Sequence, residues 1–327
     1  MRLIRLLPGV GVLCLGALLA RAVASVTGAP ALLVAIGLGA LLVNGPGVPD
    51  RYAPGVATHD LWLAGGIVLM GASLTLETVR EAGIVVLLIV VSVAGLTIGV
   101  VELLSRRGFG LDAKLGSLLA AGAGICGVSA VVAVGGAIRG REDQIAYAAA
   151  TVLLFDAVTL VVYPIAGELL GLSDVVFGIW TGVSMFSTGP VVAVGVSYSE
   201  VAGQWATLTK LTRNALIGFV VIAYAAAYAR TEADGRLSAR TLYEEFPTFI
   251  FGFLALAVFA SLSLFSPTQL AAIDTAYSWL FSVAFVGLGS EIQLHELRTT
   301  GLRPIVVVLV SLVLGSTLSL AVLTVVF

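Results

Sequence analysis

The chain has 327 residues, of which 59% are hydrophobic and 11% charged, and its formal net charge at pH 7 is −2. Its mean hydropathy is +1.09. Soluble domains are roughly 45–50% apolar and about 25% charged, so this composition excludes an ordinary soluble protein. The chain is predicted to be a polytopic membrane protein in a lipid bilayer, and we expect no nucleic-acid partner.

Apolar segments fill nearly the whole chain. A bilayer core about 30 Å thick is crossed by roughly 20 apolar residues in a helix. The segments lack the alternation of barrel strands, and a helix satisfies its own backbone in lipid. The predicted fold class is therefore all-α, a bundle of about 11 transmembrane helices. The segments lie near 6–25, 30–44, 60–76, 83–104, 114–138, 144–170, 174–199, 204–229, 247–265, 270–290 and 302–327.

The first segment allows two interpretations. Arg2 and Arg5 precede an apolar run that ends in the small residues 22–24, as in a signal peptide with its cleavage site. The other interpretation is an uncleaved helix, which Arg21 beside the small residues favours. We expect residues 1–29 to be an extra N-terminal helix.

The distribution of Lys and Arg over the loops predicts the orientation, because these residues resist translocation. With the N-terminus in the cytoplasm, eleven of them are cytoplasmic and four lie outside, and an odd helix count puts the C-terminus outside. The cytoplasmic set is Arg2, Arg5, Arg51, Arg106, Arg107, Lys114, Arg230, Arg236, Arg240, Arg298 and Arg303, and the outer set is Arg21, Arg80, Arg139 and Arg141.

An internal similarity suggests two repeats. Residues 71–83 align with 289–301 through shared glycine, leucine and arginine positions. Inverted repeats of this kind are typical of secondary transporters. A register of five helices covers the chain best, with 30–172 as the first repeat and 173–327 as the second, inside a single transporter domain.

A glycine-rich sequence, GAGICGVSA at 122–130, interrupts the fifth segment. Each glycine costs a helix roughly 1 kcal/mol relative to alanine, so we expect a broken helix whose second half presents bare N–H groups to an anion. The alternative is a small-residue face for close helix packing. A second cluster at 287–291 predicts a second broken helix that crosses the first. The substrate-binding residues expected at these breaks are Gly124, Ile125, Cys126, Gly127, Ser129, Gly289 and Ser290.

Three charged residues inside the segments are candidates for function, because charge in a bilayer is costly. Lys210 and Arg213 lie one turn apart on one helical face and can bind an anion. Alternatively, Lys210 reaches the interface and Arg213 only pins neighbouring helices. Asp156 either carries a coupling proton or cation or pairs with Arg213, and Glu291 is the second coupling candidate.

No residues suggest a metal site or a cofactor. Cys14 and Cys126 both lie within apolar segments, and His59 and His295 are isolated in sequence. No phosphate-binding loop, dinucleotide fingerprint or catalytic triad is recognisable, so we expect neither an enzyme nor an ATP-driven pump.

The block from GAGICGVSAVVAV through REDQIAYAAATVLLFD, GLSDVVFGIWTG, VVAVGVSY and ATLTKLTRNALI resembles prokaryotic inner-membrane proteins known as putative sulfate exporters. That family is similar in fold to sodium/proton antiporters and bile acid symporters, and the resemblance implies inverted five-helix repeats with two crossing broken helices. The chain departs from the family pattern at two places. Ala123 and Gly124 replace a Thr-Ser pair, and residues 186–190, Phe-Ser-Thr-Gly-Pro, replace a His-Asp-Thr-x-Gln run.

These observations predict a secondary active transporter of a small anion, sulfate-like or an organic sulfonate or carboxylate. Ser187 and Thr188 would add hydroxyl groups to the site, and sodium or a proton would drive transport. The alternatives are a channel and a coupled antiporter with another substrate. The expected location is the prokaryotic inner membrane, with the N-terminus in the cytoplasm. A homodimer is one assembly that the sequence allows.

Overall fold

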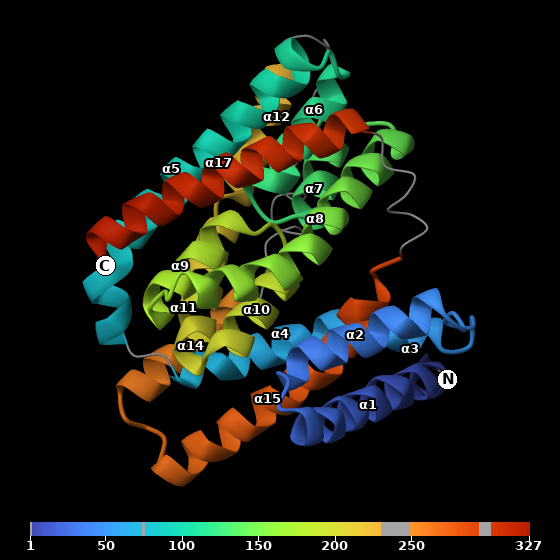
Figure 1. Ribbon diagram of the computed structural model, residues 1–327, viewed down its shortest axis with the longest axis vertical. Helices are drawn as coiled ribbons and strands as arrows, with labels where there is room; N and C mark the ends of the chain where they lie inside the picture. Colours follow the sequence, from blue (N-terminus) through green and yellow to red (C-terminus); the bar gives the residue numbers. More distant parts are fainter. Residues whose placement is uncertain (1, 74–75, 230–248, 294–301) are drawn as a thin grey trace. The chain divides into compact units, whose positions relative to one another are not determined.

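The computed structural model describes residues 2–73, 76–229, 249–293 and 302–327. Every regular element in these ranges is a helix, which confirms the all-α prediction (Figure 1). The described chain folds as two compact units, which are taken here one at a time.

Unit 1 consists of residues 1–83, 196–204 and 248–294. Helix α15 is its centre, since it packs against α1, α2 and α4, and α14 packs against α4 and η1. The elements of unit 1 are α1 (Arg2–Thr27), α2 (Ala31–Asn44), α3 (Ala53–Val56), α4 (His59–Met70), the short 3-10 helix η1 (Gly71–Ser73), α14 (Phe249–Ser261) and α15 (Pro267–Ser290).

The glycines of the 287–291 cluster do not break the helix, because α15 continues as a regular helix through Gly287 and Gly289 and ends at Ser290. Its glycines serve close packing instead. A Cβ atom on Gly289 would lie 2.0 Å from the carbonyl oxygen of Ile36 on α2, and one on Gly287 would lie 2.2 Å from Cβ of His59 on α4. Neighbouring helices supply the contacts that offset the low helix propensity of glycine.

Unit 2 consists of residues 84–195, 205–247 and 295–327, so that α5, α10 and α11 each extend from it into unit 1. The elements assigned wholly or mostly to it are α5 (Leu76–Leu103), the π-helical turn η2 (Leu104–Gly108), α6 (Ala113–Gly124), α7 (Val128–Ala137), α8 (Glu142–Leu169), α9 (Asp174–Ser184), α10 (Thr188–Tyr198), α11 (Glu200–Asn214), α12 (Ile217–Ala229) and α17 (Leu302–Val326).

Helices α6 and α7 form a helical hairpin rather than one broken helix that crosses the membrane. Gly122 on α6 faces Val131 on α7, and nearer the hairpin's open end Gly135 faces Leu118. These pairings run in opposite directions along the two helices, so the helices are antiparallel. The reversal occurs at Gly127, whose φ of +72° is accessible to glycine at little cost.

The reversal overturns one feature of the sequence-based topology. Lys114 was predicted on the cytoplasmic side and Arg139 on the outer side. In the structure the Lys114 ammonium donates to the carbonyl oxygen of Arg139 over 3.2 Å. Both residues therefore lie at the open end of this first hairpin, and predicted segment 114–138 does not cross as a single helix.

Helix α8 runs antiparallel to α9, which returns along its C-terminal half. The backbone N–H of Ser187 donates to Asp156 at the middle of α8. Further along α8, the Tyr163 hydroxyl donates to Ser184, and the Tyr163 ring stacks on Trp180 with ring centroids 4.3 Å apart. Helix α9 thus begins near the C-terminal end of α8 and ends level with Asp156.

Helix α10 then turns back, which makes α9 and α10 a second hairpin. A single residue, Ser199, joins α10 to α11, and Asn214 at the end of α11 donates to Thr188 at the start of α10, so these two helices are antiparallel. Residues 200–228 form one span in which α12 packs against α7, and the Tyr228 hydroxyl lies 3.0 Å from that of Ser117 on α6. Because α12 follows the first hairpin toward its open end, α10 and α11 occupy the opposite end of the unit.

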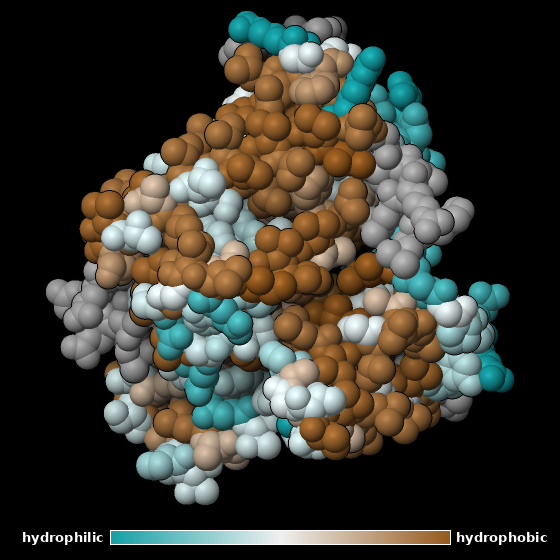
Figure 2. Space-filling model, in the orientation of Figure 1, coloured by the Kyte–Doolittle hydropathy of each residue, from teal (hydrophilic) through white to brown (hydrophobic). Residues whose placement is uncertain are grey.

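The described chain has seven helices that are long and apolar enough to cross a membrane, together with five shorter apolar helices. Each predicted segment coincides with one helix or a consecutive pair. Figure 2 shows apolar side chains over much of the visible surface. Large apolar side chains that are exposed on α17 include Leu309, Val313 and Leu318. A surface of this kind is stable against lipid and confirms a polytopic membrane protein.

The inverted five-helix repeats stay a prediction. The second copy of the 71–83 similarity extends over 294–301, which lie outside the described residues.

Candidate functional site

The tips of the two hairpins meet inside unit 2. The tip of the first hairpin is 125–127, between α6 and α7, and the tip of the second is 185–187, between α9 and α10. A Cβ atom on Gly127 would lie 2.0 Å from Oγ of Ser187 and 3.2 Å from its Cα. The absence of a side chain at residue 127 therefore lets the two backbones touch.

Arg213 on α11 binds both tips. Its Nε donates to Gly124 over 2.7 Å, and its Nη1 donates to Val183 over 2.8 Å and to Met185 over 2.7 Å. Its Nη2 donates to the carbonyl of Ala123. The last carbonyls of a helix have no partner within it, and the planar guanidinium satisfies those of α6 and α9 together. The side chain is only 1% exposed.

Lys210 lies one turn earlier on α11 and adds a second bridge. Its ammonium donates to Ile125 over 2.8 Å, to Met185 over 3.3 Å, and to the carbonyl of Phe186. An ammonium has three N–H groups, so three carbonyl acceptors match its capacity. The two cations thus hold the hairpin tips together, and direct contact of either with a substrate anion stays a prediction.

Asp156 also binds a tip. Its Oδ1 accepts a hydrogen bond of 3.0 Å from the backbone N–H of Ser187, and its side chain is buried. The carboxylate thereby satisfies one of the N–H groups at the start of α10. The sequence singled out Asp156 for its charge within an apolar segment, but this contact with the second tip was not expected.

Two helices begin where the tips meet, and their first residues carry hydroxyl groups. Ser129 lies in the first turn of α7 and is exposed, whereas Ser187 and Thr188 at the start of α10 are half-buried. Ile125 and Cys126 are buried in the first tip. Both helix N-termini carry partial positive charge, which favours an anion nearby.

Asn214 is a site residue to which the sequence analysis assigned no role. It is 2% exposed, and its Nδ2 donates to the hydroxyl of Thr188 over 3.0 Å. Its Oδ1 has no hydrogen-bond partner among the described residues. The available sequence signal was its position directly after Arg213, since a buried amide beside a buried cation needs partners too.

The second part of the predicted site, in unit 1, has a different structure. Gly289 and Ser290 end α15, and the Ser290 hydroxyl donates to the carbonyl of Gly287 over 2.6 Å. A helix C-terminus carries partial negative charge, so these residues do not form the anion-binding helix start that was expected. Glu291 follows, with Oε1 3.3 Å from Nε2 of His59.

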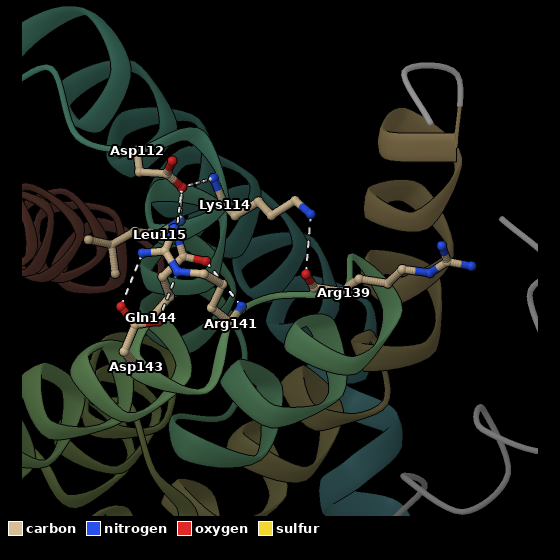
Figure 3. Close-up of polar contacts among 7 residues, drawn as sticks. All are labelled: Asp112, Lys114, Leu115, Arg139, Arg141, Asp143 and Gln144. Carbon is tan, nitrogen blue, oxygen red and sulfur yellow. Dashed lines mark hydrogen bonds and ion pairs between the residues drawn. The ribbon is translucent and has the colours of Figure 1, made fainter. Parts of the chain in front are cut away.

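A polar network closes the open end of the first hairpin (Figure 3). Asp112 caps α6 by accepting from the backbone of Lys114 over 2.9 Å, and it also accepts from Gln144 on α8 over 2.7 Å. Arg141 binds Asp143, and this hydrogen bond raises the pKa of Arg141. These contacts join the hairpin to the start of α8.

Comparison with known proteins identifies the relatives of this chain. A UPF0324 membrane protein of Nitratidesulfovibrio vulgaris is 30% identical over 83% of this chain and 77% of its own length. One from Pseudomonas aeruginosa is 31% identical over 85% of this chain and 81% of its own length. One from Bradyrhizobium diazoefficiens is 31% identical over 98% of this chain and 93% of its own length. No solved structure matches. The family model described as conserved hypothetical protein 698 matches residues 5–308, and the chain belongs to this family of UPF0324 membrane proteins.

Proposed function

We propose that the protein is a secondary active transporter of a small anion. The observation that carries this proposal is the meeting of two helical hairpins at Gly127 and Ser187. Half-length helices that end inside a membrane bundle leave backbone groups available to a ligand, and transporters use such discontinuous helices for their sites.

The chemistry at the tips favours an anion. The starts of α7 and α10 are electropositive, and Ser129, Ser187 and Thr188 supply hydroxyl donors there. Lys210 and Arg213 place two positive charges directly behind the tips, against one negative charge from Asp156. The excess of positive charge favours sulfate-like ions and small sulfonates or carboxylates, in agreement with the resemblance to putative sulfate exporters.

The N-terminus is proposed to be cytoplasmic. With both hairpins folded back, Arg139 and Arg141 join Lys114 on one side, and the two sets of basic loop residues become thirteen and two. The outer set is then Arg21 and Arg80 alone. This distribution agrees with the positive-inside rule better than eleven against four. The membrane is proposed to be a prokaryotic inner membrane.

Sodium or a proton is proposed to drive transport, and Asp156 in unit 2 and Glu291 in unit 1 are the candidate coupling groups. Asp156 accepts a hydrogen bond from the second tip, and Glu291 lies at ion-pair distance from His59. Transport needs no resident cofactor, and we propose no enzymatic activity.

Counterflow in proteoliposomes tests the proposal. Vesicles loaded with unlabelled sulfate, or with a small sulfonate or carboxylate, should take up the labelled anion transiently above its equilibrium level. A channel gives no such overshoot, because it does not exchange anions through one site. Uptake that equilibrates without overshoot and without saturation would favour the channel.

A further inference from the structure

The imidazole of His59 stands between oxygen atoms on both of its sides. Its Nδ1 lies 3.2 Å from the carbonyl oxygen of Val56. Its Nε2 lies 3.3 Å from Oε1 of Glu291 and 3.5 Å from Oδ1 of Asp60. These are ion-pair distances, and Nε2 has no well-aligned hydrogen bond.

Both ring nitrogens of His59 therefore face acceptors. A carbonyl oxygen and an ionised carboxylate only accept hydrogen bonds, and a neutral imidazole has a single N–H to offer. With His59 neutral and both carboxylates ionised, one nitrogen lone pair would point at an oxygen lone pair. One additional proton removes this repulsion, whether it resides on the imidazole or on a carboxylate.

The cluster lies where the start of α4 meets the end of α15. His59 and Asp60 lie in the first turn of α4, and Glu291 follows the last residue of α15. The imidazole is 6% exposed, whereas the side chains of Asp60 and Glu291 are 80% and 43% exposed. A proton can thus exchange with water through the carboxylates while the ring stays buried.

We propose that His59, Glu291 and Asp60 form a proton-binding site between α4 and α15. Among the described residues, the ionisable groups that face the imidazole are Asp60 on its own helix and Glu291 at the end of α15, and α3 contributes the Val56 carbonyl. Gly287 is part of the same construction, because only glycine leaves room for Cβ of His59.

The bound proton allows His59 at the start of α4 and Glu291 at the end of α15 to attract each other. When the proton leaves, the attraction between His59 and Glu291 is lost and the contact between α4 and α15 weakens. A role in coupling the proton to anion movement rests on the proposed function, whereas the proton site itself rests only on the geometry of unit 1.

The chain has two histidines, so nitrogen-15 labelling of histidine gives a direct test. His295→Gln leaves His59 as the sole labelled ring, and its nitrogen shifts are followed from about pH 5 to pH 9. We expect both nitrogens to carry hydrogen at neutral pH, and Glu291→Gln to make the ring neutral there. Asp60→Asn should have a smaller effect, because Asp60 is farther from the ring and more exposed. A His59 that titrates like histidine in a short peptide, in both the parent and Glu291→Gln, would overturn the proton site.

Counterflow separates the coupling role from the site. Glu291→Gln should flatten the dependence of anion exchange on pH between about pH 6 and pH 8. A normal pH profile in this variant, with the expected nitrogen shifts, would overturn the coupling role. Absence of counterflow in the unmodified protein would instead count against the proposed transport function and leave the proton site standing.

Discussion

Gly127 and Ser187 lie in van der Waals contact at the point where the two hairpins meet, and a methyl group on Gly127 would overlap the Ser187 side chain at 2.0 Å. The φ of Gly127 is also positive, at +72°. This contact connects the geometry of one tip directly to that of the other.

Gly127→Ala should therefore separate the tips. The φ of +72° and ψ of −137° at Gly127 are rarely adopted by any residue except glycine, so the backbone alone costs alanine about 1–3 kcal/mol, and the overlap with Ser187 adds to it. We expect a lower melting temperature and loss of counterflow. Gly136→Ala is the matched control, since Gly136 lies on α7 with no atom within 4 Å of the added Cβ. Equal effects of the two substitutions would contradict the tip contact.

Arg213→Gln should destabilise the protein, because it removes a donor that serves four carbonyl groups. Each buried polar group left without a partner costs about 1–3 kcal/mol. We expect the melting temperature in detergent to fall strongly. Arg213→Lys should recover only part of the loss, because an ammonium group lacks the planar set of N–H donors of the guanidinium. Thr212→Ala is the control on the same helix. An unchanged melting temperature of Arg213→Gln would contradict the role of Arg213 in joining the two tips. Loss of anion binding at an unchanged melting temperature would instead support Arg213 as a direct ligand of the anion.

Cysteine labelling tests the reversal of the first hairpin. In a Cys14→Ser background, single substitutions Lys114→Cys and Arg139→Cys should react with a membrane-impermeant maleimide from the same side, because those residues share a hydrogen bond. Leu170→Cys, beyond the far end of α8, should react from the other side. Reaction of the 114 and 139 positions from opposite sides would show that the segment crosses as one helix.

Substitutions of Asp156 separate its charge from its hydrogen bond. Asp156→Asn keeps an acceptor for the Ser187 N–H, so we expect its melting temperature to stay close to that of the parent. If the charge couples an ion to transport, this variant loses the sodium or pH dependence of counterflow. Asp156→Leu loses the acceptor as well, so its free energy of unfolding should fall by about 1–3 kcal/mol and its melting temperature should fall with it. Full activity with an unchanged ion dependence in Asp156→Asn would leave Glu291 as the coupling candidate.

Local chemistry in the sequence determined the helical class and the helix positions. Apolar runs in the sequence coincide with helix α2 and with most of helix α5, because a chain in lipid must satisfy its own backbone. The interruption at 122–130 was also predictable, since glycine lowers helix stability wherever it stands. Lys210, Arg213 and Asp156 drew attention because charge in an apolar segment requires a partner.

Tertiary contacts alone decided what each interruption became. Gly127 reverses the chain, whereas Gly287 and Gly289 remain inside α15, and the difference lies in the helices packed against them rather than in the glycines. A positive φ and a close helix contact make the same demand on sequence, namely the absence of a side chain.

The partners of Arg213 were hidden from the sequence for a similar reason. They are carbonyl groups of Ala123, Gly124, Val183 and Met185, and every residue has such a group. Which carbonyls are left over depends on where helices end, and which of them meet depends on how the hairpins fold together. The sequence by itself therefore determined which residues need partners, and only the tertiary structure decided that Arg213 would find them at the tips of two hairpins.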